Sequence, residues 1–283
     1  MKKLFQENIT IKQLLLFSAL IIVVIALIAV MSLYLPPAVD WHGAFRPAAL
    51  EILHGRSPYN ADGFFNPPWA AIFLVPFAIF PESIGRAIMS LTSLVVYGFV
   101  AQRLGAKKIT ILFLLLSPPV LHGILNGNID WLVILGFILP PWIGLFFLSI
   151  KPQIGLATIV FFVFSSWEEG GYKKVLVTFA PFGVASLVTI ILFGPWFLSV
   201  QNDINLAGNT SLWPLSVPVG LGLLVAAIRK NDIRFAIAAS PNLSPYVILH
   251  SWIGAILAFA SFTPEIITVV IGLWIVVIYR LIA

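Results

Sequence analysis

Most of the charged and amide side chains in this sequence interrupt apolar runs, and these interruptions are where chemistry could occur. Asp40 follows the first long apolar run, at residues 14–35. A carboxylate just beyond such a run is ionised near neutral pH and can act as a general base on a hydroxyl group. A solvated carboxylate at a membrane interface is the equally weighted structural alternative.

Lys151 is the most isolated cation, because it stands between two apolar segments and is followed by Pro152. An ionisable residue within a membrane is a functional candidate, and snorkelling to the interface is the alternative. A phosphate group is the natural partner that we expect for its ammonium. Arg46, Arg56 and Arg86 are weaker candidates for phosphate, since each could simply mark the interface.

A dense polar turn at 126–130 separates two further apolar stretches. Asn128 or Asp130 could cap the helix that follows. Capping does not require Asn126, so we also expect this turn to contact a substrate. His42 and His54 lack metal-ligand spacing, and no phosphate-binding loop, dinucleotide fingerprint or HExxH motif is present. We therefore predict neither a metal nor a cofactor.

The composition places these residues in a membrane protein. Of the 283 residues, 60% are hydrophobic and only 10% are charged, whereas soluble domains carry roughly a quarter charged residues. The polar residues are too few to cover a water-soluble fold, so we predict an all-α polytopic protein with a single transmembrane domain over 1–283. The absence of cysteine excludes disulfides. The net charge of +5 follows from basic tracts between apolar runs, so no nucleic-acid partner is expected.

The basic residues also predict the topology. Lys2, Lys3 and Lys12 precede the first span, which puts the N-terminus in the cytoplasm and the loop 36–67 outside. Apolar residues at helical spacing in 45–53 predict an interfacial helix within this outer loop. The basic clusters at 103–108 and 167–174 return the chain to the cytoplasm.

Proline pairs predict that several helices are broken. Pro140 and Pro141 divide 131–150 into two short helices, which leaves 151–153 near the outer face. A second polar outer loop is expected at 194–218, including Gln201, Asn202 and Asp203. In total we predict about nine to eleven membrane helices, several of them broken, in a plasma-membrane protein whose active face is extracytoplasmic.

Six short blocks occur in order along most of the chain. They are Asp40-Trp41-His42 with Gly55-Arg56-Ser57-Pro58-Tyr59, Phe65-Asn66-Pro67-Pro68-Trp69, Asn126-Gly127-Asn128, Lys151-Pro152-Gln153, Phe193-Gly194-Pro195-Trp196, and Ser240-Pro241-Asn242 with Tyr246. Their order and spacing resemble the GT-C membrane glycosyltransferases, particularly family 87, the polyprenyl-phosphate-mannose-dependent α-mannosyltransferase-like proteins.

The resemblance implies a GT-C-like helical bundle that transfers a hexose, mannose-like, from a polyprenyl-phosphate donor to an acceptor on the extracytoplasmic face. Asp40 matches the family's catalytic acidic position. The substrate-binding residues that the blocks and the polar pattern together suggest are Lys151, Gln153, Arg86, Asn126, Asn128, Asp130, Arg46, Arg56 and Tyr59. Lipid-linked donor and membrane lipids are the implied partners.

Two alternatives stay open. The compact loops suit a non-catalytic, GT-C-derived structural subunit of a larger membrane complex. The broken helices also suit a transporter or flippase for a lipid-linked substrate, although the internal repeat typical of such proteins is not evident in the sequence.

Overall fold

Proline residues divide the apolar runs of this chain into short helices. Pro68, Pro118, Pro141 and Pro152 each occupy the first position of a helix. A proline suits this position because its fixed φ is already helical and its missing N–H would have no partner there. The preceding residue is held in an extended conformation, so each proline also ends the segment before it.

The computed structural model describes residues 10–199 and 208–282. Over these residues the structure is helical, with no strand and one isolated β-bridge between Asn209 and Ile248, so the all-α prediction is confirmed. The α-helices are α1 (Ile11–Tyr34), α2 (Arg46–Leu53), α3 (Pro68–Ala78), α4 (Glu82–Arg103), α5 (Lys108–Leu115), α6 (Pro118–Asn126), α7 (Asp130–Leu135), α8 (Pro141–Leu148), α9 (Pro152–Phe193), α10 (Val217–Lys230), α11 (Ile233–Asn242), α12 (Ile253–Ala258) and α13 (Thr263–Ile282). Short 3-10 or π turns are η1 (Trp41–Phe45), η2 (Pro58–Asn60), η3 (Trp196–Ser199) and η4 (Leu249–Trp252).

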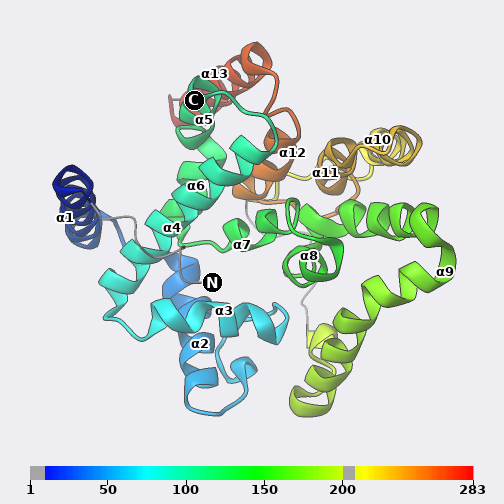
Figure 1. Ribbon diagram of the computed structural model, residues 1–283, viewed down its shortest axis with the longest axis horizontal. Helices are drawn as coiled ribbons and strands as arrows, with labels where there is room; N and C mark the ends of the chain where they lie inside the picture. The colour runs from blue at the N-terminus through cyan, green and yellow to red at the C-terminus, as the bar shows by residue number, and fades with distance from the viewer. Residues whose placement is uncertain (1–9, 200–207, 283) are drawn as a thin grey trace.

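Four of the described helices, α1, α4, α9 and α13, are long and apolar enough to cross a membrane. The helices α5 and α6 meet at a 51° bend and would make a fifth span if they cross as one unit. Helix α9 consists of two arms that meet at Gly170 and Gly171, where the backbone leaves the helical conformation. Figure 1 shows this change of direction plainly.

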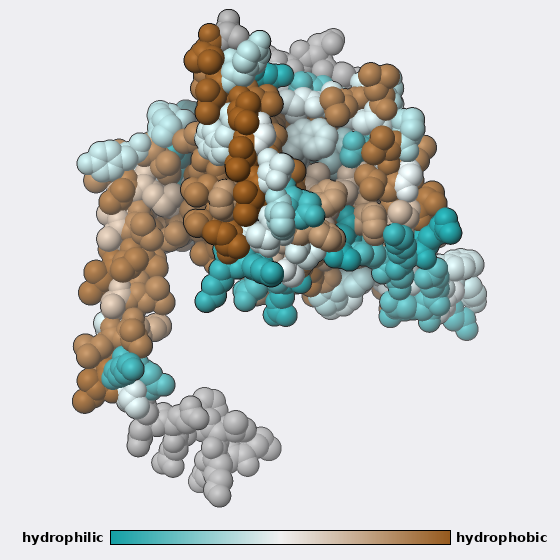
Figure 2. Space-filling model, turned by 90° about the horizontal axis from the view of Figure 1, so that it is seen from above, coloured by the Kyte–Doolittle hydropathy of each residue, from teal (hydrophilic) through white to brown (hydrophobic). Residues whose placement is uncertain are grey.

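The apolar surface of the molecule is extensive. Helix α1 contacts α4, extends beyond the body in Figure 2 and has no buried residue (Figures 1 and 2). Most of its leucines and isoleucines are exposed, as are apolar side chains on α9, α10 and α13. Hydrophilic residues gather along one edge of the body in Figure 2. Apolar side chains on this scale require a non-aqueous surrounding, which agrees with a membrane protein.

The interior is built around α9, which contacts α7, α8 and α11, while α11 also packs against α12; α7 lies between α4 and α8 (Figure 1). Fully buried side chains here include Ile134, Leu145, Ile237 and Ile253. The helix predicted in 45–53 is present as α2, and the two short helices predicted in 131–150 are α7 and α8. The predicted positions Lys2, Lys3, Gln201, Asn202 and Asp203 lie outside the described residues.

Candidate functional site

Five polar side chains from distant parts of the chain meet inside the helical body. Asp40 lies at the start of η1, Asn128 and Asp130 at the junction of α6 and α7, Lys151 immediately before α9, and His250 in η4. Each therefore comes from the end of a helix. Gly127 ends α6 next to Asn128, and Pro152 starts α9 next to Lys151, so helix breaks at these two points let the side chains turn into the cluster.

Asn128 is the centre of this cluster. Its side-chain Nδ2 donates a hydrogen bond to Asp40 Oδ2 at 2.6 Å and lies 3.1 Å from His250 Nε2. Its Oδ1 accepts from the Ile129 backbone N–H at 2.7 Å and from the Lys151 ammonium. A primary amide can donate two hydrogen bonds and accept two. All four are used within the protein, and the side chain is 7% exposed.

Asp130 supplies the buried charge of the cluster. Its carboxylate is fully buried, with Oδ1 2.5 Å from Lys151 Nζ and Oδ2 2.5 Å from His250 Nδ1. Asp130 does not cap α7, whose N-cap is Ile129, but Asn128 accepts a hydrogen bond from the backbone N–H of that N-cap residue. Within the structure Asp130 balances the Lys151 charge, so the ammonium does not depend on a phosphate for a counter-charge. A buried pair of this kind repays its desolvation only with close geometry and further hydrogen bonds. Lys151 also donates to Asn128, and Asp130 Oδ2 pairs with His250, whereas Asp130 Oδ1 has the ion pair but no hydrogen bond.

Asp40 is the member of the cluster that reaches the surface. Its side chain is half-buried, whereas Asn128, Asp130, Lys151 and His250 are buried. Tyr246 lies near this carboxylate: burial, and secondarily the Asp40 charge, raises the pKa of its hydroxyl. One carboxylate of the cluster, that of Asp40, is thus accessible at the molecular surface, and the buried Asn128 amide fixes its position by a hydrogen bond.

Gly127 allows the Asp40 segment to reach Asn128. It ends α6 in the left-handed conformation, with φ +67°, and a Cβ added here would lie 2.6 Å from Trp41 Cβ and 2.9 Å from Ala38 Cβ. Both contacts are closer than carbon atoms can approach. Only glycine satisfies the backbone conformation and the close packing of the chain on either side of Asp40.

Gly127→Ala is accordingly expected to destabilise the protein by more than about 1–2 kcal/mol, the cost of the left-handed conformation alone. Thermal unfolding in detergent measures the loss. Gly43→Ala is the matched control, because Gly43 lies in the same Asp40 segment and a Cβ there meets nothing within 4 Å. Equal unfolding temperatures for the two variants would show that Gly127 does not hold this packing.

Several predicted site residues lie outside the hydrogen-bonded cluster. Asn126 donates to the His122 carbonyl at 2.8 Å, and Arg46 Nη2 donates to the Phe80 carbonyl at 3.3 Å. Gln153 is half-buried in the first turn of α9. Arg86, on α4, is 7% exposed, and its Nε and Nη2 are buried without a hydrogen-bond partner.

Arg56 is paired within its own loop. Its guanidinium binds Glu51 through two hydrogen bonds of 2.7 Å, and Asn60 also donates to this carboxylate. The hydrogen bonds from Arg56, and then from Asn60, lower the pKa of Glu51 to about 2. The carboxylate is therefore ionised at neutral pH and matches the Arg56 charge.

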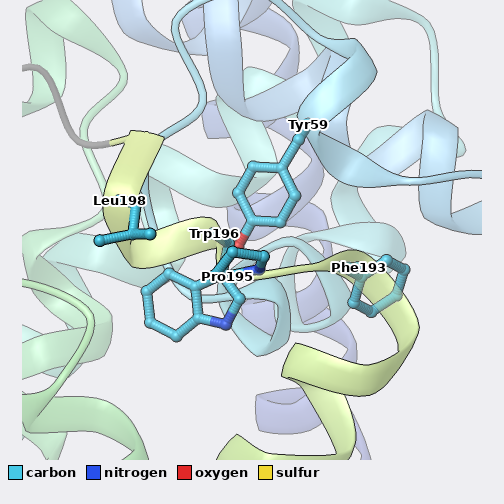
Figure 3. A pocket seen from close by; sticks show the side chains of 5 residues that line it. All are labelled: Tyr59, Phe193, Pro195, Trp196 and Leu198. Atoms are coloured by element: carbon cyan, nitrogen blue, oxygen red, sulfur yellow. The ribbon is translucent and has the colours of Figure 1, made fainter.

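Tyr59 lines an aromatic pocket of about 220 Å³ together with Phe193, Pro195, Trp196 and Leu198. In Figure 3 the Tyr59 ring extends toward Pro195 and Trp196, with Leu198 and Phe193 on either side. The Tyr59 hydroxyl donates to the Asn66 carbonyl at 2.9 Å, and the Asn66 amide donates to the Ile150 carbonyl at 2.9 Å. Two hydrogen bonds thus connect this pocket wall to the residue before Lys151.

His250 is the member of the cluster that sequence reasoning missed. It is a single ionisable residue among apolar neighbours at 247–260, the same pattern that singled out Lys151. His122 was also passed over as a site residue. Its ring stacks on that of His250, with centroids 5.5 Å apart and an interplanar angle of 20°.

The fold and the cluster define a class: a helical protein with membrane-length helices and a buried ionic network that ends in one accessible carboxylate. Comparisons with protein-family models, with curated proteins and with solved structures find no match for this chain. Among the described residues, no group of three histidine, aspartate or glutamate side chains is placed to hold a metal ion.

Proposed function

We propose that this protein is a membrane glycosyltransferase that moves a hexose, mannose-like, from a polyprenyl-phosphate donor to a hydroxyl acceptor on the extracytoplasmic face. The observation that carries the proposal is the half-buried Asp40 carboxylate, held at 2.6 Å by Asn128 in front of the buried Asp130–Lys151 pair. A general base must be accessible to its substrate and fixed in direction. The reaction class, sugar transfer from a lipid phosphate, is suggested by the six sequence blocks, whose order and spacing resemble those of the GT-C glycosyltransferases.

In the proposed reaction Asp40 accepts the proton of the acceptor hydroxyl. The hydroxyl oxygen attacks the anomeric carbon of the sugar, and the bond between that carbon and the phosphate oxygen breaks. Polyprenyl phosphate leaves with the electron pair of this bond, and the configuration at the anomeric carbon inverts. No nucleotide takes part, because the lipid phosphate itself is the leaving group.

The donor phosphate requires a cation whose charge is not already balanced. The charge of Lys151 is balanced by Asp130, and the charge of Arg56 by Glu51. We therefore assign the phosphate contact to Arg86, whose buried Nε and Nη2 have no hydrogen-bond partner in the described structure. Arg46, whose Nε is also buried without a partner, is the second cation of this contact. Lys151 then does not contact the phosphate but supports the cluster through Asn128 and Asp130.

Arg86→Gln is expected to weaken donor binding by about 10- to 100-fold, which corresponds to the roughly 1.5–3 kcal/mol of a hydrogen bond to a charged group. Folding stability is expected to stay the same or to rise, because the variant removes a buried charge that has no protein partner. Titration with polyprenyl phosphate and thermal unfolding measure the two effects. A large loss of stability with unchanged lipid binding would give Arg86 a structural role.

The proposed topology places the N-terminus in the cytoplasm and the loop 36–67 outside. It also counts about nine to eleven membrane helices, because the short helices between α3 and α12 would enter the membrane as broken or re-entrant segments. A cysteine at Asn60, introduced into the cysteine-free chain, is expected to react with an impermeant reagent added to intact cells. Labelling only after the inner face is opened would reverse the topology and remove Asp40 from the outer face.

The activity itself is tested by incubating the purified protein with polyprenyl-phosphate mannose and a hydroxyl acceptor. Release of polyprenyl phosphate together with a glycosylated product is expected. Mass spectrometry of co-purifying lipids provides an independent measurement, in which a bound polyprenyl phosphate supports the enzyme. Fixed protein partners and no such lipid would favour a structural subunit.

A second candidate function is transport of a lipid-linked substrate. The buried ionisable residues Asp130, Lys151 and His250 favour it, since ionisable groups inside a membrane often mark a substrate or ion pathway. Reconstitution in liposomes separates the two functions. Movement of the donor across the bilayer without product formation would select the transporter.

A further inference from the structure

The orientation of the Asn128 amide is determined by its neighbours. Its Oδ1 faces two donors, the Ile129 N–H and the Lys151 ammonium, and its Nδ2 faces the Asp40 carboxylate, an acceptor. The flipped amide would place its N–H groups against two donors and its oxygen against a carboxylate. Three unfavourable contacts would replace three favourable ones, so the flip is excluded.

This orientation determines the protonation of His250. Asn128 Nδ2 lies 3.1 Å from His250 Nε2, so an Asn128 N–H points at that ring nitrogen, which must accept. The other ring nitrogen, Nδ1, lies 2.5 Å from Asp130 Oδ2 and must therefore carry the proton. The ring is consequently neutral, with its proton on Nδ1.

We propose that His250 is a positioning residue: as the neutral ring with its proton on Nδ1, it holds the Asn128 amide so that one N–H is presented to Asp40. The inference rests on the proposed function in taking Asp40 as the acting carboxylate. Asp130 fixes the ring from one side, and Asn128 transmits its position to Asp40 on the other. Asn128, whose four hydrogen bonds are all made within the protein, is then part of this support and does not bind substrate.

The groups around His250 agree with this assignment. Ser251 Oγ lies 3.3 Å from Nδ1 and is a weaker neighbour than Asp130, and His122 contacts the ring by stacking. His250 is 2% exposed, so water does not compete freely for either nitrogen. The order Asp130, His250, Asn128, Asp40 forms one continuous line of hydrogen bonds from a buried carboxylate to an accessible one.

The ring state can be measured without any activity. The chain contains four histidines, so protein labelled with ¹⁵N-histidine gives a simple spectrum, and His250→Gln identifies the His250 signals. We expect a protonated Nδ1 and an unprotonated Nε2 at neutral pH, assigned from their couplings to the ring carbon-bound protons. A proton on Nε2, or on both nitrogens, overturns the inference.

A pair of variants tests the positioning. In His250→Gln the side-chain oxygen takes the place of Nε2 and can still accept from Asn128. In His250→Asn the amide N–H takes the place of Nδ1 and can still donate to Asp130, but Asn128 loses its acceptor. We expect kcat to fall on the order of 10²-fold in His250→Asn, because misplacement of a reacting group has this size of effect. His250→Gln is expected to keep a clearly higher kcat, and KM for the donor is expected to change little in either.

His54→Gln is the matched control, since it makes the same chemical change as His250→Gln at an exposed histidine away from the cluster. Its kcat is expected to remain close to the wild-type value. Equal losses in His250→Gln and His250→Asn, or a loss confined to KM, overturn the positioning role. Thermal unfolding of each variant identifies any that fail to fold, and the spectrum of the wild-type protein decides the question in that case.

Failure of this inference is distinguishable from failure of the proposed function. Full turnover by Asp40→Asn would refute the role of Asp40 while leaving the His250 spectrum as expected. The opposite ring state, combined with an inactive Asp40→Asn, would refute the His250 assignment and leave the general base in place.

Discussion

Sugar transfer by Asp40→Asn is expected to be roughly 10²- to 10⁴-fold slower than in the wild type, the usual cost of losing a general base. An asparagine retains the shape of the side chain, and its oxygen can still accept the hydrogen bond from Asn128. Folding and donor binding are therefore expected to be unchanged. The measurement is the initial rate of polyprenyl-phosphate release, alongside thermal unfolding and donor titration.

Asp62→Asn is the matched control for this experiment. Asp62 is an exposed carboxylate in the same loop, so the substitution makes the same chemical change away from the cluster. Its rate is expected to match the wild type. If Asp40→Asn also turned over at the wild-type rate, the carboxylate would have no part in the reaction.

Lys151→Met is expected to destabilise the protein by about 3–5 kcal/mol, because it leaves the Asp130 carboxylate buried without its cation. Asp130→Asn is expected to cost a similar amount, since it leaves the buried Lys151 ammonium unpaired. The double variant Asp130→Asn/Lys151→Met carries neither charge and should recover a large part of the loss. Unfolding by heat or denaturant in the same detergent measures all three.

An exposed ion pair provides the comparison. Lys174 lies 3.2 Å from Glu169, with the two side chains 47% and 57% exposed. Exposed pairs contribute about 0–1 kcal/mol, so Lys174→Met should unfold at nearly the wild-type temperature. A Lys151→Met protein as stable as Lys174→Met would mean that the Asp130–Lys151 pair does not form.

Much of the helical architecture is predictable from the sequence because prolines and apolar run lengths act locally. The division of 131–150 into α7 and α8, the helix in 45–53 and the first span all follow from residues within a few positions. The helix boundaries do not determine how often the chain crosses the membrane, because only four or five of the described helices have the length and composition of a span. The count of nine to eleven remains a prediction.

The composition of the cluster is only partly predictable. Asp40, Asn128, Asp130 and Lys151 stand out because each interrupts an apolar segment, and the structure brings these four together. Their pairing does not follow from the sequence, because whether Lys151 meets a phosphate or Asp130 depends on how helix ends pack. His250 has no motif around it, and its hydrogen-bond partners are about 120 residues away in the chain.

The separation of the partners along the chain has a consequence for biosynthesis. Lys151 is 23 residues from Asn128, and Asp130 lies between them in the chain, whereas His250 is 120 residues from Asp130. Lys151 can therefore neutralise Asp130 while the later helices are still being made, which lowers the cost of passing either charge into lipid during insertion. His250 is made after both Asp130 and Lys151, so the line of hydrogen bonds to Asp40 is completed after the ion pair.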